Sequence, residues 1–262
     1  MSVPGSEDGA TLDGQNRKLS RKRRFKQASL RAAARLAPAI YMAYMALVAR
    51  TSRIDRTGLD RILAEHGKGH DIALAVLHQD VFITPFFLKN LGVQTVVSIG
   101  DAGGVVVSTL GRFGYVIQRG GSSSRKSRRT PVLGKMIDYA LEQKGTGLIT
   151  AITVDGSTGP AGACKAGVVQ FAARTGVPVY CLRAHASRGL HVRTWDRTQI
   201  PLPFSRLSLD AAGPFGIAPD GRPGDPDQTR RQVETALHEL HGRSFTVHGQ
   251  HPVPDLVRLE GP

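Results

Sequence analysis

The chain has 262 residues, 40% of them hydrophobic, so it is long enough to bury one sizeable core. Two cysteines, Cys164 and Cys181, argue against a disulfide scaffold and fit a reducing compartment. The formal net charge of +14 predicts an acidic partner, which could be nucleic acid, an anionic membrane, or an acidic carrier or substrate.

The N-terminal residues predict a disordered basic tail over 1–27, with no secretory signal peptide at its start. Its dense basic run contains the candidate anion-binding and membrane-binding residues Arg21, Lys22, Arg23 and Arg24. Residues 28–50 are apolar but too short and too interrupted by charges and a proline to span a bilayer, and we expect an amphipathic helix that lies on a membrane. The alternative is a solvated tail before a core helix.

From residue 51 to residue 245, short apolar or β-branched runs alternate with helical patterns. This alternation predicts one α/β domain with a mixed, largely parallel central sheet flanked by helices. Residues 214–226 are predicted to form a surface loop and 246–262 a C-terminal tail. The predicted strands are 72–77, 93–99, 115–117, 148–154, 177–182 and 207–209, and the predicted helices are 59–65, 105–112, 132–142, 168–174 and 227–241.

His78 stands where the predicted strand 72–77 ends, with Asp80 shortly after it. Polar groups at strand ends build the sites of open α/β sheets. An imidazole can take a proton from a hydroxyl at neutral pH if a neighbour fixes its tautomer, so His78 is a candidate general base. The alternative is a histidine that only caps the following helix.

A second polar element, Asp155-Gly156-Ser157-Thr158-Gly159-Pro160, follows the predicted strand 148–154. Its glycines allow a tight turn whose backbone N–H groups could face an anion or a developing oxyanion. The spacing fits neither a Walker loop nor a dinucleotide-binding loop, and aspartate replaces the first glycine of a nucleophile elbow.

Clustered cations and small residues occupy 119–129, where Arg119 and Arg125 could bind phosphate or a carrier's phosphopantetheine arm. The alternative is a solvated loop. His238 with His241, and His248 with His251, have helical spacing for a metal, but no cysteine or carboxylate set completes a site. We therefore expect no metal and no cofactor.

Several motifs in order resemble one family, a bacterial branch of the lysophospholipid acyltransferase superfamily that was long described as a domain of unknown function and includes late acyltransferases of lipid A. The resemblance runs from about residue 49 to residue 213. It is carried by His78, 113–120, Val154 to Pro160, 165–169, 176–179, Trp195-Asp196-Arg197 and Ser205-Arg206.

The resemblance implies a glycerolipid acyltransferase-like fold and transfer of an acyl group from an acyl carrier protein or coenzyme A thioester to a hydroxyl of a phospholipid or lipid A type acceptor. It implies a peripheral or monotopic protein at the cytoplasmic face of the bacterial inner membrane, with anionic lipids as partners. His78 matches the family's base. The implied substrate-binding residues are Arg119, Asp155, Gly156, Ser157, Gly159 and Lys165.

The chain departs from the family pattern in three places, one of which is Asp101-Ala102-Gly103 where the branch has an Asp-Gly pair. Ile83 occupies the place of the usual carboxylate one turn after the base, so Asp80, Asp101 or Asp155 would have to orient His78. Ser157-Thr158 replaces the usual Pro-Arg, which shifts expected phosphate recognition to Arg119, Arg125 or Lys165.

Three other functions remain open from the sequence. A catalytically inactive lipid-binding protein would keep the fold and the basic anchor. A nucleic-acid binder would rest on charge alone, since aromatic residues make up only 6% of the chain. A serine hydrolase would use Ser157 with His78.

Overall fold

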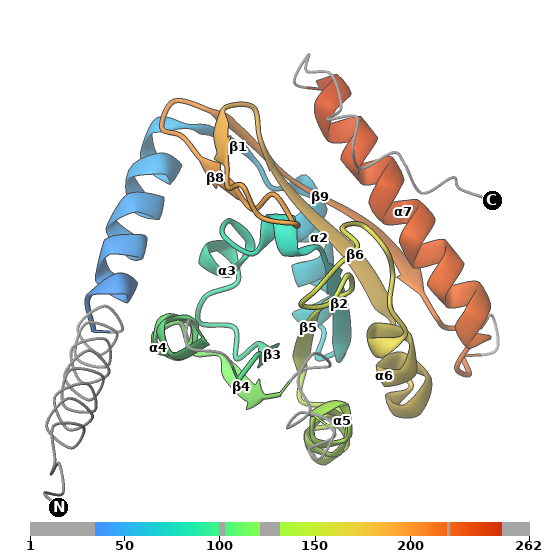
Figure 1. Cartoon of the computed structure of the whole chain (residues 1–262). Coiled ribbons are helices and arrows are strands. Elements are labelled where there is room, and N and C mark those ends of the chain that lie inside the picture. Colours follow the sequence, from blue (N-terminus) through green and yellow to red (C-terminus); the bar gives the residue numbers. More distant parts are fainter. Residues whose placement is uncertain (1–34, 100–102, 121–131, 219–220, 248–262) are drawn as a thin grey trace, which may run out of the picture.

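The computed structural model describes residues 35–99, 103–120, 132–218 and 221–247 (Figure 1). A helix over 35–51 comes first. The elements that follow are β1 (Arg53–Asp55), α2 (Thr57–His66), β2 (Ile72–Val76), the 3₁₀ turn η1 (His78–Asp80), α3 (Thr84–Phe87), β3 (Gln94–Val97), α4 (Gly103–Arg112), β4 (Val116–Arg119), α5 (Val132–Glu142), β5 (Ile149–Thr153), α6 (Gly167–Thr175), β6 (Val179–Ala186), β7 (Gly189–His191), β8 (Gln199–Pro201), β9 (Arg206–Phe215) and α7 (Pro226–Val247).

The central sheet has seven strands in the order β1-β9-β6-β2-β5-β3-β4. All neighbours pair in parallel except β6 and β9, which are antiparallel. The predicted α/β class with a mixed, largely parallel sheet is therefore confirmed. Parallel strands joined through helices need both faces of the sheet covered.

The residues of β2 show how both faces are buried. Ile72, Leu74 and Val76 point into one apolar cluster, which also receives Met45 and Val48 from the helix over 35–51. The alternating residues, Ala73 and Ala75 in β2 and Leu77 just after it, belong to the second cluster, formed with α5, α6 and α7. Successive side chains of a strand point to opposite faces, so a strand covered on both sides becomes a continuous apolar run.

Several boundaries differ from the predictions. Strand β9 continues to Phe215, so the predicted loop over 214–226 begins inside a strand, and its residues are ordered there by pairing with β6. Helix α7 continues to Val247, two residues past the predicted domain end at 245. The short elements β1, β7, β8 and α3 were not predicted, because three or four residues carry too little periodicity.

The helix over 35–51 covers the part of the predicted segment 28–50 that is described, and 28–34 and the basic tail lie outside the described residues. Tyr41 donates a hydrogen bond to the carbonyl of Phe82 (2.8 Å), and Tyr44 donates one to that of Pro201 (2.6 Å). This helix thus rests on the domain through one face. None of the described helices is both long enough and apolar enough to cross a membrane.

Candidate active site

Two neighbouring parallel strands deliver the central residues of the site. Strands β2 and β5 pair with Val76 opposite Thr153, and the N–H of Val154 donates to the carbonyl of Val76 at 2.9 Å. Each strand ends at its carboxyl end in a polar residue, His78 after β2 and Asp155 after β5. The shared register therefore places these two residues side by side, at the sheet edge where α/β proteins bind ligands.

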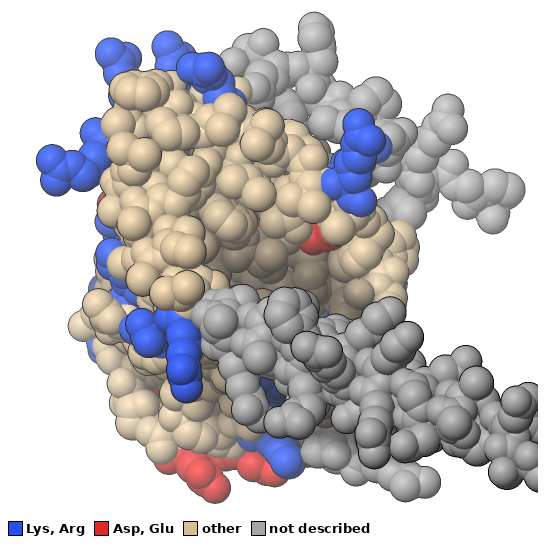
Figure 2. Space-filling model, turned by 60° about the vertical axis from the view of Figure 1, so that its left-hand side comes forward, with Lys and Arg blue, Asp and Glu red and all other residues tan. Residues whose placement is uncertain are grey.

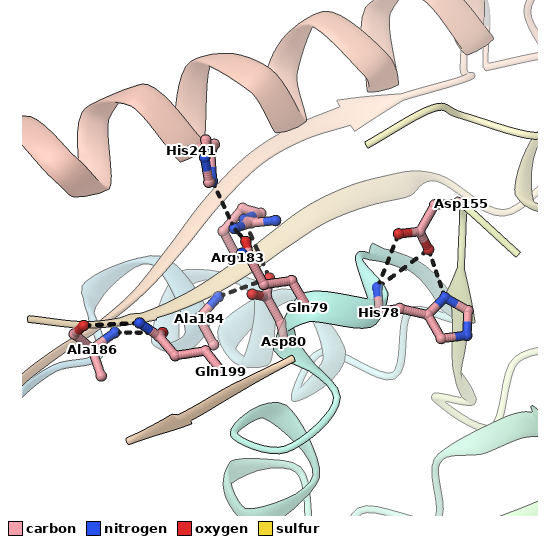
Figure 3. Close-up of polar contacts among 9 residues, drawn as sticks. All are labelled: His78, Gln79, Asp80, Asp155, Arg183, Ala184, Ala186, Gln199 and His241. Atoms are coloured by element: carbon pink, nitrogen blue, oxygen red, sulfur yellow. Dashed lines mark hydrogen bonds and ion pairs between the residues drawn. The ribbon is translucent and has the colours of Figure 1, made fainter. Parts of the chain in front are cut away.

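Asp155 holds His78 through two groups. The imidazole Nδ1 of His78 lies 2.6 Å from Oδ1 of Asp155, and the backbone N–H of His78 donates to both carboxylate oxygens, at 3.2 and 3.3 Å (Figure 3). The Asp155 side chain is 1% exposed, whereas that of His78 is 23% exposed. A carboxylate accepting from Nδ1–H leaves Nε2 without a proton, so the exposed ring edge can act as a base.

Asp80, the other predicted catalytic carboxylate, faces away from His78. Its Oδ2 lies 3.2 Å from Nε of the buried Arg183 and accepts the N–H of Ala184 at 3.2 Å. In Figure 3 the Asp80 side chain points toward Arg183, and His78 points toward Asp155. Burial raises the pKa of Asp80 to about 6, against the opposing effect of the Arg183 guanidinium. Asp80 therefore belongs to a structural network, and Asp155 supplies the carboxylate that Ile83 lacks.

The loop after β5 brings a cation to the site. Gly156 has φ +67°, and a Cβ built on it would lie 2.7 Å from Nζ of Lys165, whose side chain therefore runs across the loop. The backbone N–H of Lys165 donates to the carbonyl of Val154 at 2.8 Å, which fixes the segment before α6. Two predicted substrate-binding residues, Gly156 and Lys165, thus lie together on the loop that follows Asp155.

Ser157 lies on the same loop. Its Oγ is shielded from solvent and has no hydrogen-bond partner among the residues that the structure describes. A nucleophilic serine is normally held by its base through a hydrogen bond, although that bond can lengthen without substrate. Among the described residues, Ser157 and His78 therefore do not form the hydrogen-bonded pair that a serine hydrolase would use.

Trp195, which the sequence singled out only as part of a family motif, borders the site. Its ring centroid lies 5.1 Å from that of His78, at an interplanar angle of 58°. Gly159, with φ +72°, packs against the same indole, because a Cβ there would lie 2.8 Å from Cε3 of Trp195. The segment between β7 and β8 carries Trp195 and thereby covers one side of the imidazole with an apolar wall.

Arg119 lies apart from this group. It ends β4, the edge strand, and its Nη1 donates to the carbonyl of Gly103 at 3.2 Å, at the start of α4. Three strand spacings separate β2 from β4, or roughly 14 Å at about 4.8 Å each. Arg125, Asp101 and the basic residues Arg21 to Arg24 lie outside the described residues.

The remaining candidate groups have other positions. His241 accepts a hydrogen bond from Arg183 (2.9 Å), and His238 contacts the carbonyl of Gly162 (3.2 Å). The described part of the chain holds no cluster of three or more His, Cys, Asp or Glu residues suited to a metal. Both cysteines are buried, and burial raises the pKa of Cys164 to about 12, so it is not an activated thiol.

No family model matches the chain. The chain is 23% identical over 184 residues to an uncharacterized protein of Rickettsia prowazekii (strain Madrid E), a match that covers 68% of this chain and 79% of that protein. Among solved structures it is similar to the 1-acyl-sn-glycerophosphate (LPA) acyltransferase PlsC from Thermotoga maritima. That match has a TM-score of 0.46 and 15% identity, and it covers 83% of this chain and 81% of the other.

Proposed function

We propose that this protein is a membrane-associated acyltransferase that moves a fatty acyl group from an acyl carrier protein or coenzyme A thioester to a hydroxyl of a phospholipid or lipid A type acceptor. The observation that carries the proposal is the 2.6 Å contact between Nδ1 of the partly exposed His78 and Oδ1 of the buried Asp155. The motif resemblance gives the reaction class, and the contact supplies the orienting carboxylate that the usual position lacks.

In this reaction Nε2 of His78 takes the proton of the acceptor hydroxyl as its oxygen attacks the thioester carbonyl. Asp155 keeps the imidazole in the required tautomer and stabilises the imidazolium that forms. Backbone N–H groups of the loop over 156–159 stabilise the oxyanion, as preorganised donors do in acyl transfer. When the tetrahedral intermediate collapses, the C–S bond breaks and the thiolate takes the proton back from His78, so the base is regenerated.

Cations near the site support an acidic substrate. Lys165 lies over Gly156, the residue after Asp155, and Arg119 ends a strand roughly 14 Å from the end of β2. We assign to Lys165 a phosphate or oxyanion close to the reacting centre, and to Arg119 a more distant phosphate of the acceptor or donor. Ser157, with its unpartnered hydroxyl, would hydrogen-bond the same substrate.

A lipid acceptor implies contact with a membrane, and the family resemblance implies the cytoplasmic face of the inner membrane. The face seen in Figure 2 is largely uncharged and hollowed, with Lys and Arg at its margins. Such a surface suits an acyl chain with an anionic headgroup, and the basic residues Arg21 to Arg24 would add attraction to anionic lipids.

The test is transfer of radiolabelled acyl chains, from acyl carrier protein and from coenzyme A, into a total membrane lipid extract. The purified protein should form a labelled lipid, and His78→Ala should form none. His70→Ala is the matched control, because His70 is an exposed histidine paired with Glu65 away from the site. Absence of transfer from both donors, with vesicle binding intact, would instead indicate a lipid-binding protein without activity.

A further inference from the structure

The helix over 35–51 has an outward face that nothing in the described residues covers. Leu36, Ile40 and Leu47 are 60%, 66% and 50% exposed, and Ala43 continues the same stripe at helical spacing. The opposite face is buried, with Met45 fully inaccessible. A contiguous exposed apolar stripe on a soluble surface marks a site of contact with a partner or a membrane.

Phe204 adds a second exposed apolar group. Its side chain is 72% exposed, the largest exposed fraction among the large hydrophobic residues that the structure describes. Its φ is +61°, in the left-handed region that bulky residues avoid. Glycine at this position would relieve the backbone strain and remove the exposed ring. Phe204 therefore makes no evident contribution to the stability of the folded protein. Strained residues of this kind point to a functional contact.

Hydrogen bonds join Phe204 to the end of the helix. The backbone N–H of Phe204 donates to Oγ1 of Thr51 at 3.3 Å, and the same Oγ1 donates to the carbonyl of Leu47 at 2.8 Å. In Figure 1 the turn between β8 and β9 lies beside the last turn of this helix. Phe204 therefore extends the apolar stripe at its C-terminal end.

Arginines surround the Phe204 turn. Arg53 is the register partner of Arg206, and its N–H donates to the carbonyl of Ser205, next to Phe204. The carbonyl of Arg188 accepts from Leu202 and from Ser205 Oγ. All three arginines are exposed, and within the described ranges none of them forms an ion pair.

We infer that these residues form one bilayer-docking surface, in which Leu36, Ile40, Leu47 and Phe204 enter the interface and Arg53, Arg188 and Arg206 contact lipid phosphates. An apolar stripe beside unpaired guanidinium groups is the chemistry that binds an anionic membrane. The inference rests on the proposed function only in that both need a lipid surface, and it adds Phe204, Arg188 and Arg206, which are distant in sequence, to the predicted membrane-associating segment over 28–50.

The experiment measures binding of the full-length protein to vesicles of phosphatidylethanolamine with and without phosphatidylglycerol. Phe204→Gly should weaken binding about tenfold, because a large apolar side chain leaves the interface. The same variant should melt at a higher temperature, because glycine accepts the positive φ. Arg53→Gln and Arg206→Gln should each weaken binding to the anionic vesicles about fivefold and reduce its salt dependence.

Two matched controls complete the design. Leu141→Ser removes a similarly exposed apolar side chain, 47% exposed on α5, and should leave vesicle affinity unchanged. Lys144→Gln removes an exposed cation and should likewise leave vesicle affinity unchanged. Unchanged vesicle affinity in Phe204→Gly would overturn the inference, as would a dimer in light scattering that Phe204→Gly dissociates without loss of vesicle binding. Acyl transfer into detergent-dispersed lipid is scored separately, so loss of transfer alone counts only against the proposed function.

Discussion

The carboxylate of Asp155 binds both the ring and the backbone of His78, although 77 positions separate the two residues along the chain. Because the N–H of His78 and the Nδ1 atom share one carboxylate, Asp155 fixes the main chain at the end of β2 together with the orientation of the imidazole. This arrangement replaces a carboxylate one helical turn after the histidine with one from the neighbouring strand. The first prediction follows from it.

Asp155→Asn should reduce kcat of acyl transfer by about 100-fold or more, since an amide can present its NH2 to Nδ1 and so stabilise the wrong imidazole tautomer. The measurement is acyl transfer under saturating donor and acceptor. Asp138→Asn on α5, an acid outside the site, is the control for loss of one negative charge. If the Asp155→Asn protein is folded and retains the parental kcat, the contact between Asp155 and His78 has no part in the mechanism.

Trp195 offers a direct optical report on the site, because it is the only tryptophan of the chain and its ring lies 5.1 Å from that of His78. Contact with the imidazole affects indole emission, so His78→Ala should change Trp195 fluorescence at constant pH. His191→Ala, which removes an exposed histidine on the same hairpin, should leave the emission unchanged, and the converse pattern would assign the effect to His191.

As a positioning residue, Trp195 should also affect the reaction. Trp195→Ala should lower kcat about tenfold, because the imidazole loses the wall that limits its motion and excludes water. Trp195→Phe should recover most of that loss, since a phenyl ring can still cover His78. Equal activity of both variants and the parent protein would show that Trp195 contributes only to packing.

The meeting of His78 with the loop after β5 could be predicted from the sequence, because both follow apolar runs and parallel strands deliver their carboxyl ends to one edge. That Asp155 rather than Asp80 contacts His78 could not be predicted from the sequence. Asp80 is only two residues from His78 but turns to the opposite side of the chain within the turn η1. The separation of two residues along the sequence does not reveal this change of direction.

Trp195 and Arg183 were also beyond sequence patterns, for different reasons. Trp195 depends on a hairpin of two three-residue strands, which leave almost no periodic signal. Arg183 is 1% exposed in the middle of the fully buried strand β6, where an isolated charge would be too costly. Its partners Asp80 and Gln79 lie about a hundred positions earlier, so only the fold explains its burial.

The Asp80–Arg183 pair gives a stability prediction. Asp80→Asn should lower the free energy of unfolding by about 3–5 kcal/mol, because it leaves the buried guanidinium without a counter-charge. Adding Arg183→Met removes that charge, so the double variant should be more stable than Asp80→Asn alone. Urea unfolding of the parent, both single variants and the double variant gives the coupling energy. Simple additivity of the two losses would contradict a charge pair.

His241 contacts the same Arg183 and gives a prediction for acidic pH. Burial, followed by the nearby Arg183 charge, lowers the pKa of His241 to about 3, below its ordinary 6.5. Below pH 6.5 the unfolded chain therefore binds a proton at His241 that the folded protein does not bind. The stability present above pH 6.5 is progressively lost as pH falls toward 3. At pH 5 this loss is on the order of 2 kcal/mol. Asp80 acts in the opposite direction, because its raised pKa stabilises the folded protein as pH falls through about 6.

His241→Asn separates the two groups, since asparagine can still accept a hydrogen bond from Arg183 but does not titrate. Between pH 7 and pH 5 the parent should lose on the order of 2 kcal/mol more unfolding free energy than the variant does. Urea unfolding at the two pH values measures this difference. His238→Asn, at an exposed histidine on the same helix, is the control for the substitution itself. A parallel loss in the parent and in His241→Asn would mean that His241 is free to protonate in the folded state.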